Sequence, residues 1–175
     1  LQLSLNISAD DLLGDELAHR VSALLRRYGL PAEQLIFEIT ESAVMSNPEQ
    51  ALTILQQLRG LGISLSVDDF GTGYSSLAQL KRMPVQELKI DQSFIRDLDE
   101  ASEDSVIVRS TIDMSHSLGL KVVAEGVEYE RCLHLLERWR CDTAQGYLIS
   151  RPLAAKAFES WLEQNREAST REVQS

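Results

Sequence analysis

Short strand-like runs alternate with longer helix-like segments along the whole chain. In the first seven residues, apolar side chains occupy the odd positions and polar side chains the even ones, a period of two that predicts a half-buried strand. Later apolar runs are short and bounded by turn-forming residues, as strands usually are. We expect strands at 1–7, 35–40, 63–67, 87–90, 121–124 and 144–149. We expect helices at about 8–28, 48–59, 76–82, 104–118, 130–139 and 154–165, followed by a polar tail at 166–175 that frays.

Several residues mark where the predicted helices begin and end. Ser8 and Asp11 have the spacing of a capping box, and Gly29 follows the end of the same predicted helix. Pro48 is suited to the first turn of a helix, because its missing N–H would have no partner there. Pro84 prevents the short helix at 76–82 from continuing.

Six successive strand–helix units predict an α/β protein with a parallel sheet, either a TIM-like (β/α) barrel or a doubly wound sheet. Polar residues follow nearly every strand, and barrels collect catalytic groups from the carboxyl ends of many strands. No G-x-G-x-x-G motif follows a strand, so the pattern favours the barrel. A closed barrel needs about eight strands. Because the sequence starts at Leu1, inside a strand, we expect that the first strand or strands of the barrel are missing.

Composition fits one globular domain and argues against some partners. The chain has 175 residues, of which 43% are hydrophobic, enough for one core. Asp and Glu number 27 against 17 Lys and Arg, which gives a net charge of −10. A chain this acidic is poorly suited to duplex nucleic acid or to an anionic membrane surface. If its substrate is an anion, the site must recruit cations, which points to metal ions.

The cysteines and the hydropathy pattern bear on location. Cys132 and Cys141 are too few for a disulfide framework and lack the C-x-x-C spacing of zinc sites. No run of about 18 apolar residues and no signal peptide is present. We therefore expect a cytoplasmic domain. Whether the parent protein is anchored to a membrane stays open.

The polar residues at the predicted strand ends are mostly oxygen donors. None of the three histidines lies at a strand end. Carboxylate and amide oxygens without His or Cys suit hard cations such as Mg²⁺, Mn²⁺ or Ca²⁺, and two such ions would bridge several carboxylates. A lysine among these acids is a candidate to stabilise phosphoryl oxygens or to position water. The residues are Asn6, Glu38, Asp68, Asp69, Lys89, Asp91, Glu125, Glu128 and Gln145.

The most specific segment is the loop after the third predicted strand. Asp68 and Asp69 close that strand, and the sequence continues Phe-Gly-Thr-Gly-Tyr-Ser-Ser-Leu. Gly71 and Gly73 allow the loop to fold tightly around a metal site.

With its neighbours, this loop resembles the EAL domain, the cyclic di-GMP-specific phosphodiesterase of bacterial signalling. The resemblance covers nearly the whole chain. The matching pieces, in order, are residues 5–8 (LNIS), 38–41 (EITE), 68–77 (DDFGTGYSSL), 89–91 (KID), 124–128 (AEGVE) and 145–147 (QGY).

The resemblance implies a reaction, a metal set and two catalytic residues. The reaction is hydrolysis of one phosphodiester of cyclic di-GMP to linear pGpG. It would use two divalent ions, either Mg²⁺ or Mn²⁺. Lys89 would hold the hydrolytic water or the phosphate, and Glu125 would assist proton transfer. The implied metal ligands are Asn6, Glu38, Asp68, Asp69 on the second ion, and Glu125.

Four other matched residues have supporting roles in this comparison. Glu128 and Gln145 would line the site and touch ligand or water, and Glu41 would steady the loop after Asp68. Asp91 fits equally well as a supporting residue or as part of the site itself. The same loop takes part in dimer contacts in this family, so we also expect a homodimer. Regulatory or GGDEF-type domains are expected upstream in the parent protein.

The sequence departs from the family pattern in three places. The Glu-Ala-Leu motif of the first strand has no counterpart here, and neither does the Arg that follows it. Tyr129 stands where Thr is usual and Arg140 where Gly is usual, which we interpret as surface or packing changes. We expect the domain to cover 1–165, and the chain as written to be weakly active or inactive, with exposed sheet edges at 1–6 and 144–149 that favour dimerisation or exchange of elements.

Two alternatives remain beside the phosphodiesterase. The first is an inactive EAL domain that acts as a cyclic di-GMP receptor or as a protein-interaction module. The second is another metal-dependent hydrolase on a similar barrel. The presence of Asp68, Asp69 and Lys89 argues against the receptor, because degenerate domains usually lose such residues.

Overall fold

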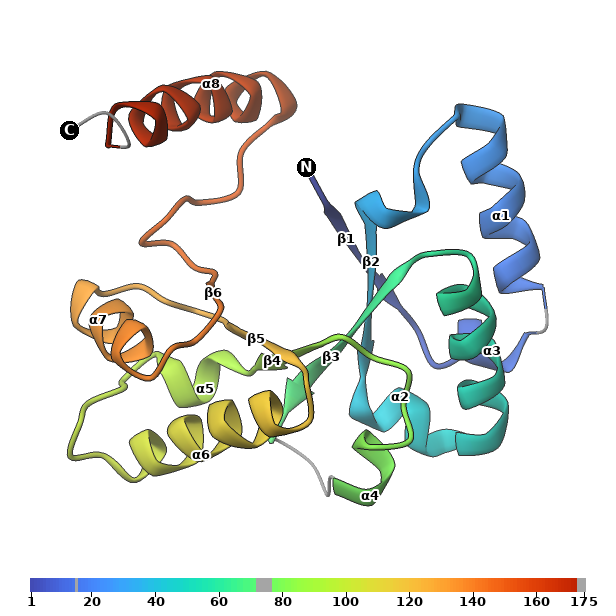
Figure 1. The fold of residues 1–175 in the computed structure, drawn as a ribbon, viewed down its shortest axis with the longest axis horizontal. Coiled ribbons are helices and arrows are strands. Elements are labelled where there is room, and N and C mark those ends of the chain that lie inside the picture. The colour runs from blue at the N-terminus through green and yellow to red at the C-terminus, as the bar shows by residue number, and fades with distance from the viewer. Residues whose placement is uncertain (15, 72–76, 173–175) are drawn as a thin grey trace.

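The structure is a computed structural model that describes residues 1–14, 16–71 and 77–172. Strands and helices alternate along it, as the sequence predicts (Figure 1). The strands are β1 (Leu3–Ile7), β2 (Leu35–Thr40), β3 (Ser64–Phe70), β4 (Glu87–Ile90), β5 (Lys121–Ala124) and β6 (Thr143–Ala144). The α-helices are α1 (Leu17–Tyr28), α2 (Glu41–Ser46), α3 (Pro48–Gly60), α4 (Leu77–Leu80), α5 (Gln92–Ile95), α6 (Glu103–Ser117), α7 (Glu130–Arg138) and α8 (Ala155–Glu172). Two short 3₁₀ helices, η1 (Asp11–Leu13) and η2 (Ala32–Gln34), complete the described elements.

The six described strands form one parallel sheet in the order β1-β2-β3-β4-β5-β6. Each strand therefore pairs with the next strand along the chain, with at least one α-helix between them (Figure 1). This order is that of a barrel wall and differs from that of a doubly wound sheet, in which the order reverses at a switch point. The expected α/β class and parallel sheet are confirmed.

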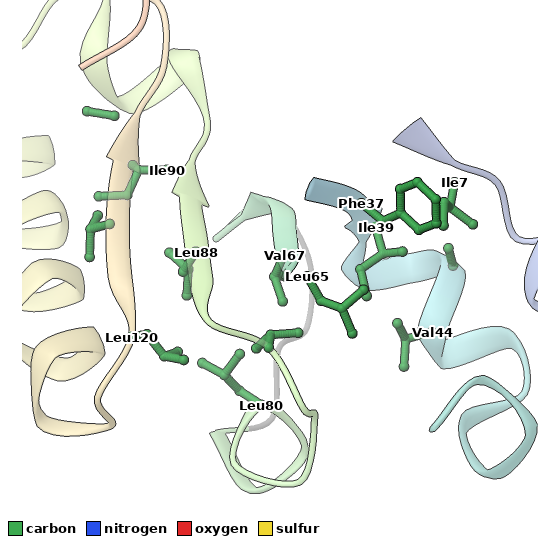
Figure 2. Packing of buried hydrophobic residues seen from close by; sticks show 14 of the residues in the cluster. Ile7, Phe37, Ile39, Val44, Leu65, Val67, Leu80, Leu88, Ile90 and Leu120 are labelled. Atoms are coloured by element: carbon green, nitrogen blue, oxygen red, sulfur yellow. The ribbon is translucent and has the colours of Figure 1, made fainter. Parts of the chain in front are cut away.

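The two faces of the sheet differ in polarity. One face carries apolar side chains from successive strands, among them Ile39, Leu65 and Leu88, which are fully buried (Figure 2). Leu55 of α3 and Ile112 of α6 belong to the same core cluster, so the helices cover this face. Since side chains alternate along a strand, the residues between these apolar ones point to the opposite face. That opposite face carries the site described below.

The first predicted helix is divided in the structure. Ser8 and Asp11 do form the expected reciprocal contacts: the Ser8 N–H donates to Asp11 Oδ2 at 3.1 Å, and the Asp11 N–H donates to Ser8 Oγ at 3.3 Å. However, only the short η1 follows these contacts, and its N-cap residue is Asp10, without a side-chain capping hydrogen bond. Gly14 leaves the helical conformation with φ −99° and ψ 127°, so the predicted helix does not continue from there. The α-helix then begins at Leu17 and ends at Tyr28, before left-handed Gly29.

Two other predictions of secondary structure are wrong, and two short helices were not predicted. The strand expected at 144–149 ends at residue 144, because the chain then turns toward the loop after β5. The tail expected to fray from residue 166 is helical as far as Glu172. The short helices α2 and α5 were not predicted. They follow strands directly and have too few residues for a periodic pattern to reveal them.

Two of the departures from the family pattern, Tyr129 and Arg140, flank α7. Tyr129 is the N-cap residue, and its side chain makes no capping hydrogen bond there. Arg140 has φ 62°, in the left-handed region that favours glycine. Arg140 is exposed, so the change lies at the surface as expected, and its backbone conformation adds a preference for glycine at this turn. Among the described residues, no helix is long and apolar enough to cross a membrane.

Candidate active site

The polar face of the sheet gathers charged residues from neighbouring strands. Asn6 on β1 is in register with Glu38 on β2, and Thr40 on β2 is in register with Asp68 on β3. Partners in a parallel register point to the same side, so Asn6 and Glu38 project from the same face. Glu38 is buried there, with 8% of its surface exposed.

Lys89 lies at the centre of the acidic groups. Its Nζ atom is 2.7 Å from Glu125 Oε1, 2.9 Å from Glu38 Oε2 and 3.2 Å from Asp68 Oδ1. Lys89 is only 3% exposed. Burial lowers the pKa of Lys89, but its hydrogen bonds to Glu125 and Glu38 outweigh burial, so the pKa lies above its ordinary value. The ammonium group therefore stays charged and draws together carboxylates from β2, from β3 and from the loop after β5.

A β-bulge places two consecutive aspartates against Lys89. The register of β3 with β4 pairs Val67 with Leu88 and Phe70 with Ile90, so two residues of β3 face one residue of β4. Those two residues are Asp68 and Asp69. Asp69 has φ 55°, and its N–H donates to Asp68 Oδ1 at 3.0 Å. This left-handed residue and the bulge turn both carboxylates toward the same site, where a regular strand would send them to opposite faces.

Asp68, Asp69 and Glu125 form an acidic cluster suited to divalent cations. Each offers one carboxylate oxygen, and these oxygens all lie within 4.8 Å of one another. Burial, together with Asp68 and Asp91, raises the pKa of Asp69. Burial also raises the pKa of Glu125, although Lys89 acts in the opposite direction. The raised pKa values show that the charged forms of these carboxylates are disfavoured when they lie so close together. A shared hard cation would stabilise the charged forms, so the donor set fits Mg²⁺ or Mn²⁺.

The loop that carries Glu125 is held in place by two glycines. Gly126 has φ 71°, and a Cβ atom there would approach Gln92 of α5 to 2.5 Å. Gly146 lies directly against the backbone of Val127, where a Cβ atom would overlap Val127 N and O. The Val127 N–H donates to Gln145 O at 3.0 Å. These close approaches fix Glu125, Glu128 and Gln145 relative to one another.

The remaining predicted residues surround this centre. Glu128 and Gln145 line a polar cavity of about 280 Å³ together with Glu125. Asn6 lines a separate open cavity of about 470 Å³ with Ser8 and Thr40. Within the described residues, no hydrogen bond joins the Asn6 side chain to Lys89 or to the acidic cluster.

The supporting residues lie beside the bulge. Asp91 caps α5 by accepting a hydrogen bond from the Ser93 N–H at 3.0 Å; burial raises the pKa of Asp91, but the hydrogen bonds from Ser93 and Gln92 outweigh it and lower the pKa. Glu41 opens α2 and lines a small apolar cavity with Phe70. Gly71 has φ 99°, a left-handed conformation that favours glycine. Gly73 lies outside the described residues.

Two polar residues of this face were missed in the sequence. Ser66 is fully buried two residues before Asp68, and Glu87 is its register partner, two residues before Lys89. Burial raises the pKa of Glu87. The signal was present in the spacing, since residues two apart on a strand share a face.

A parallel sheet in barrel order, with a lysine and an acidic cluster at the carboxyl ends of its strands, is the arrangement of a (β/α)-barrel protein whose acidic cluster suits divalent cations. The profile of the EAL domain family matches residues 1–152. The chain belongs to the EAL domain family.

Relatives within this family have assigned activities. The chain is 46% identical over 162 residues to the protein named cyclic di-GMP phosphodiesterase NbdA of Pseudomonas aeruginosa, covering 93% of this chain and 21% of that protein. The chain thus spans about a fifth of the length of this curated relative.

Solved structures of the family superimpose on the chain. The MucR phosphodiesterase of Pseudomonas aeruginosa in complex with cyclic di-GMP gives a TM-score of 0.86 at 43% identity, over 90% of this chain and 70% of that one. BlrP1 of Klebsiella pneumoniae, with manganese and cyclic di-GMP, gives 0.80 at 34% identity, over 86% of this chain and 39% of that one. The TIM-like barrel expected for the fold is therefore confirmed at the level of the family.

Proposed function

We propose that this domain hydrolyses cyclic di-GMP to linear pGpG with the help of divalent cations. The observation that carries this proposal is the position of Lys89, which contacts Glu38, Asp68 and Glu125 at distances of 3.2 Å or less. A buried lysine ammonium group surrounded by carboxylates, with Asp69 beside them, is an arrangement that can activate water next to a phosphodiester.

We propose that Asp68, Asp69 and Glu125 hold the cations, with Glu38 and Asn6 completing the ligand set. The proximity of the three acidic oxygens supports this assignment. Two Mg²⁺ or Mn²⁺ ions, when bound, would lower the pKa of a water molecule and neutralise charge on the phosphate. The solved complex of BlrP1 with manganese agrees with this choice of metal.

The residues of this chain then have distinct tasks. Lys89 donates hydrogen bonds to a nonbridging phosphate oxygen or to the attacking water, because its ammonium group is fixed and always charged. Glu125 is placed to accept a proton from that water, since it lies 2.7 Å from Lys89 and its pKa is raised by burial. The water oxygen forms a bond to phosphorus, and the bond from phosphorus to the 3′ oxygen breaks. The leaving oxygen takes up a proton, which yields pGpG.

The choice of substrate rests on relatives. Proteins at 44–46% identity carry the name of cyclic di-GMP phosphodiesterase, alone or with a diguanylate cyclase activity. By analogy with MucR, whose name includes a diguanylate cyclase activity, we propose that a regulatory or GGDEF-type domain accompanies this domain in its parent protein. We also propose that the domain acts in the cytoplasm and works as a homodimer.

The test is turnover of cyclic di-GMP by the purified full-length protein with Mn²⁺ or Mg²⁺, with pGpG measured by chromatography. We expect Lys89→Met to lower kcat by about 100-fold or more, the loss typical of removing a donor that stabilises a transition state. Lys121→Met is the matched control, because Lys121 is an exposed lysine at the opposite end of β5. It should leave kcat unchanged.

Three outcomes would count against the proposal. Equal kcat in wild type and Lys89→Met would remove Lys89 from the chemistry. Binding of cyclic di-GMP without turnover in the wild type would favour a receptor. Absence of both binding and turnover would leave a protein-interaction module.

A further inference from the structure

Glu87 lies on the polar face of β4 and has no task in the chemistry proposed above. Leu88, between Glu87 and Lys89, is fully buried in the hydrophobic core under the helices. Because side chains alternate along a strand, Glu87 and Lys89 both point to the opposite, polar face. Glu87 is in register with Ser66 on β3, and Ser66 is in register with Glu38 on β2. A row of polar side chains therefore crosses three strands beside Lys89.

The carboxyl group of Glu87 is held there at a cost. Within the described part of the chain, Glu87 takes part in no ion pair. Burial raises its pKa, and the nearby Ser66 hydroxyl acts in the opposite direction, although Ser66 Oγ makes no hydrogen bond of ordinary geometry with any described residue. A largely buried carboxylate without a cationic partner destabilises a fold. Destabilising groups of this kind concentrate at functional sites, which points to a role in the chemistry.

Lys89 needs a further anion, because all three of its present partners belong to the proposed ligand set. Its Nζ atom contacts Glu38, Asp68 and Glu125 at 3.2 Å or less. A divalent cation bound to these carboxylates neutralises their charge and repels an ammonium group nearby. Lys89 is only 3% exposed, so water cannot replace the lost attraction. In the metal-loaded site, the ammonium group therefore requires a carboxylate that holds no cation.

Glu87 is well placed to be that carboxylate. It lies outside the proposed ligand set and precedes Lys89 by two residues on the same face of the same strand. Although burial raises the pKa of Glu87, Lys89 is among the groups that lower it, so the two charges already attract each other. Lys121, the register partner of Glu87 on β5, is exposed and forms no ion pair with it. Asp91 is engaged at the start of α5, where it accepts a hydrogen bond from the Ser93 N–H.

We propose that Glu87 is a positioning residue that holds the Lys89 ammonium group when divalent cations occupy the acidic cluster. The inference rests on the proposed function, because it assumes that Glu38, Asp68 and Glu125 then bind the cations. Glu87 touches neither substrate nor cation and acts only through Lys89. The ammonium group thereby keeps its charge and its place beside the phosphate, and the cost of burying Glu87 is confined to the metal-free protein.

The first experiment measures local stability and needs no turnover. Hydrogen exchange of the β4 amides, followed by mass spectrometry, is compared for full-length wild type and Glu87→Gln, with a chelator and with Mn²⁺. With the chelator we expect slower exchange in Glu87→Gln, because a buried charge without a partner is gone. With Mn²⁺ we expect the order to reverse, with exchange in Glu87→Gln faster by about 5-fold or more, the factor that corresponds to the loss of one charge-assisted hydrogen bond. A general packing effect would act in the same direction under both conditions.

The second experiment measures turnover of cyclic di-GMP by the same proteins with Mn²⁺. Glu87→Gln should lower kcat by about 10-fold with KM nearly unchanged, because it displaces a group that acts in the transition state. In a Lys89→Met background, Glu87→Gln should cause no further loss of kcat, since its effect passes through Lys89. Glu137→Gln is the matched control, because Glu137 is an exposed glutamate on α7. It should leave both kcat and the exchange of β4 unchanged.

Two outcomes would overturn the inference. Slower exchange in Glu87→Gln under both conditions would show that Glu87 affects only the stability of β4. An equal loss of kcat with and without Lys89 would show that Glu87 does not act through Lys89. Failure of the proposed function is distinguishable from both, since a wild type without turnover would refute that function while the exchange experiment would still decide the role of Glu87.

Discussion

The ammonium group of Lys89 lies 2.7 Å from Glu125 Oε1, and this ion pair joins β4 to the loop that follows β5. The side chain of Lys89 is 4% exposed and that of Glu125 is 18% exposed. The same lysine contacts Glu38 on β2 and Asp68 on β3. One side chain therefore connects the sheet across the site.

This arrangement predicts that Lys89 supports the metal-free fold as well as catalysis. In Lys89→Met, three carboxylates lose a buried partner, and breaking a buried ion pair in this way typically costs about 3–5 kcal/mol. We expect a loss of that size in the free energy of unfolding, measured by urea denaturation with a chelator present. Mn²⁺ should restore part of the loss, because it would bind the exposed carboxylates.

An exposed ion pair serves as the control for Lys89. Arg82 contacts Glu49 at 3.1 Å, with side-chain exposures of 59% and 81%. Arg82→Met should change the free energy of unfolding by less than about 1 kcal/mol, with no response to Mn²⁺. Similar losses in the two variants would contradict the prediction.

Because Glu87 is largely buried, we predict that the free energy of unfolding depends on pH through its carboxyl group. Burial raises the pKa of Glu87 above its ordinary value of 4.5, so the folded protein binds a proton at this carboxyl more tightly than the unfolded chain. The stabilisation is fully present below pH 4.5 and is lost as the pH rises through the folded pKa. Glu87→Gln should therefore flatten the fall in stability above pH 4.5 and should be more stable than wild type at pH 7.

Urea denaturation at several pH values would measure this effect. Glu137→Gln is the control, because Glu137 is an exposed glutamate on α7. Parallel pH profiles for wild type and Glu87→Gln would show that Glu87 is not the group responsible.

We predict that replacing Arg140 with glycine stabilises the protein. It has φ 62°, a conformation that costs a residue with a side chain about 1 kcal/mol or more. Arg140→Gly should increase the free energy of unfolding by about 0.5–1 kcal/mol, and Arg140→Ala should not. Gly119→Ala tests the reverse, because Gly119 has φ 75° and a Cβ atom there would meet open space. It should destabilise by a similar amount, and a stabilising Gly119→Ala would refute the backbone explanation.

Gly146 predicts a link between packing and ligand binding. A methyl group at this position would overlap the backbone of Val127 and displace the loop that carries Glu125 and Glu128. We expect Gly146→Ala to destabilise the protein by about 1–3 kcal/mol and to weaken cyclic di-GMP binding, measured by calorimetry. Gly60→Ala is the matched control, since a Cβ atom there meets nothing within 4 Å. Wild-type binding in Gly146→Ala would show that the loop does not depend on this contact.

The sequence by itself determined the class of fold and most of the candidate residues. Apolar and polar positions alternate on scales of two to four residues, and such local patterns follow from the geometry of strands and helices. The position of Lys89 and the aspartates at strand ends was therefore predictable, because parallel strands present their carboxyl ends at one edge of the sheet. The loop at 68–77 identified the family.

The tertiary structure decided which of these residues meet. Asp69 would point away from Asp68 in a regular strand, and only the bulge against β4 turns it into the site. The contact between Gly146 and Val127 ends β6 early and shapes the cavity beside Glu125. That cavity is lined by Gln92 and by residues of the two loops that follow β5 and β6, which lie about 30–55 positions further along the chain. Such distances depend on strand register and backbone packing, which no local pattern encodes.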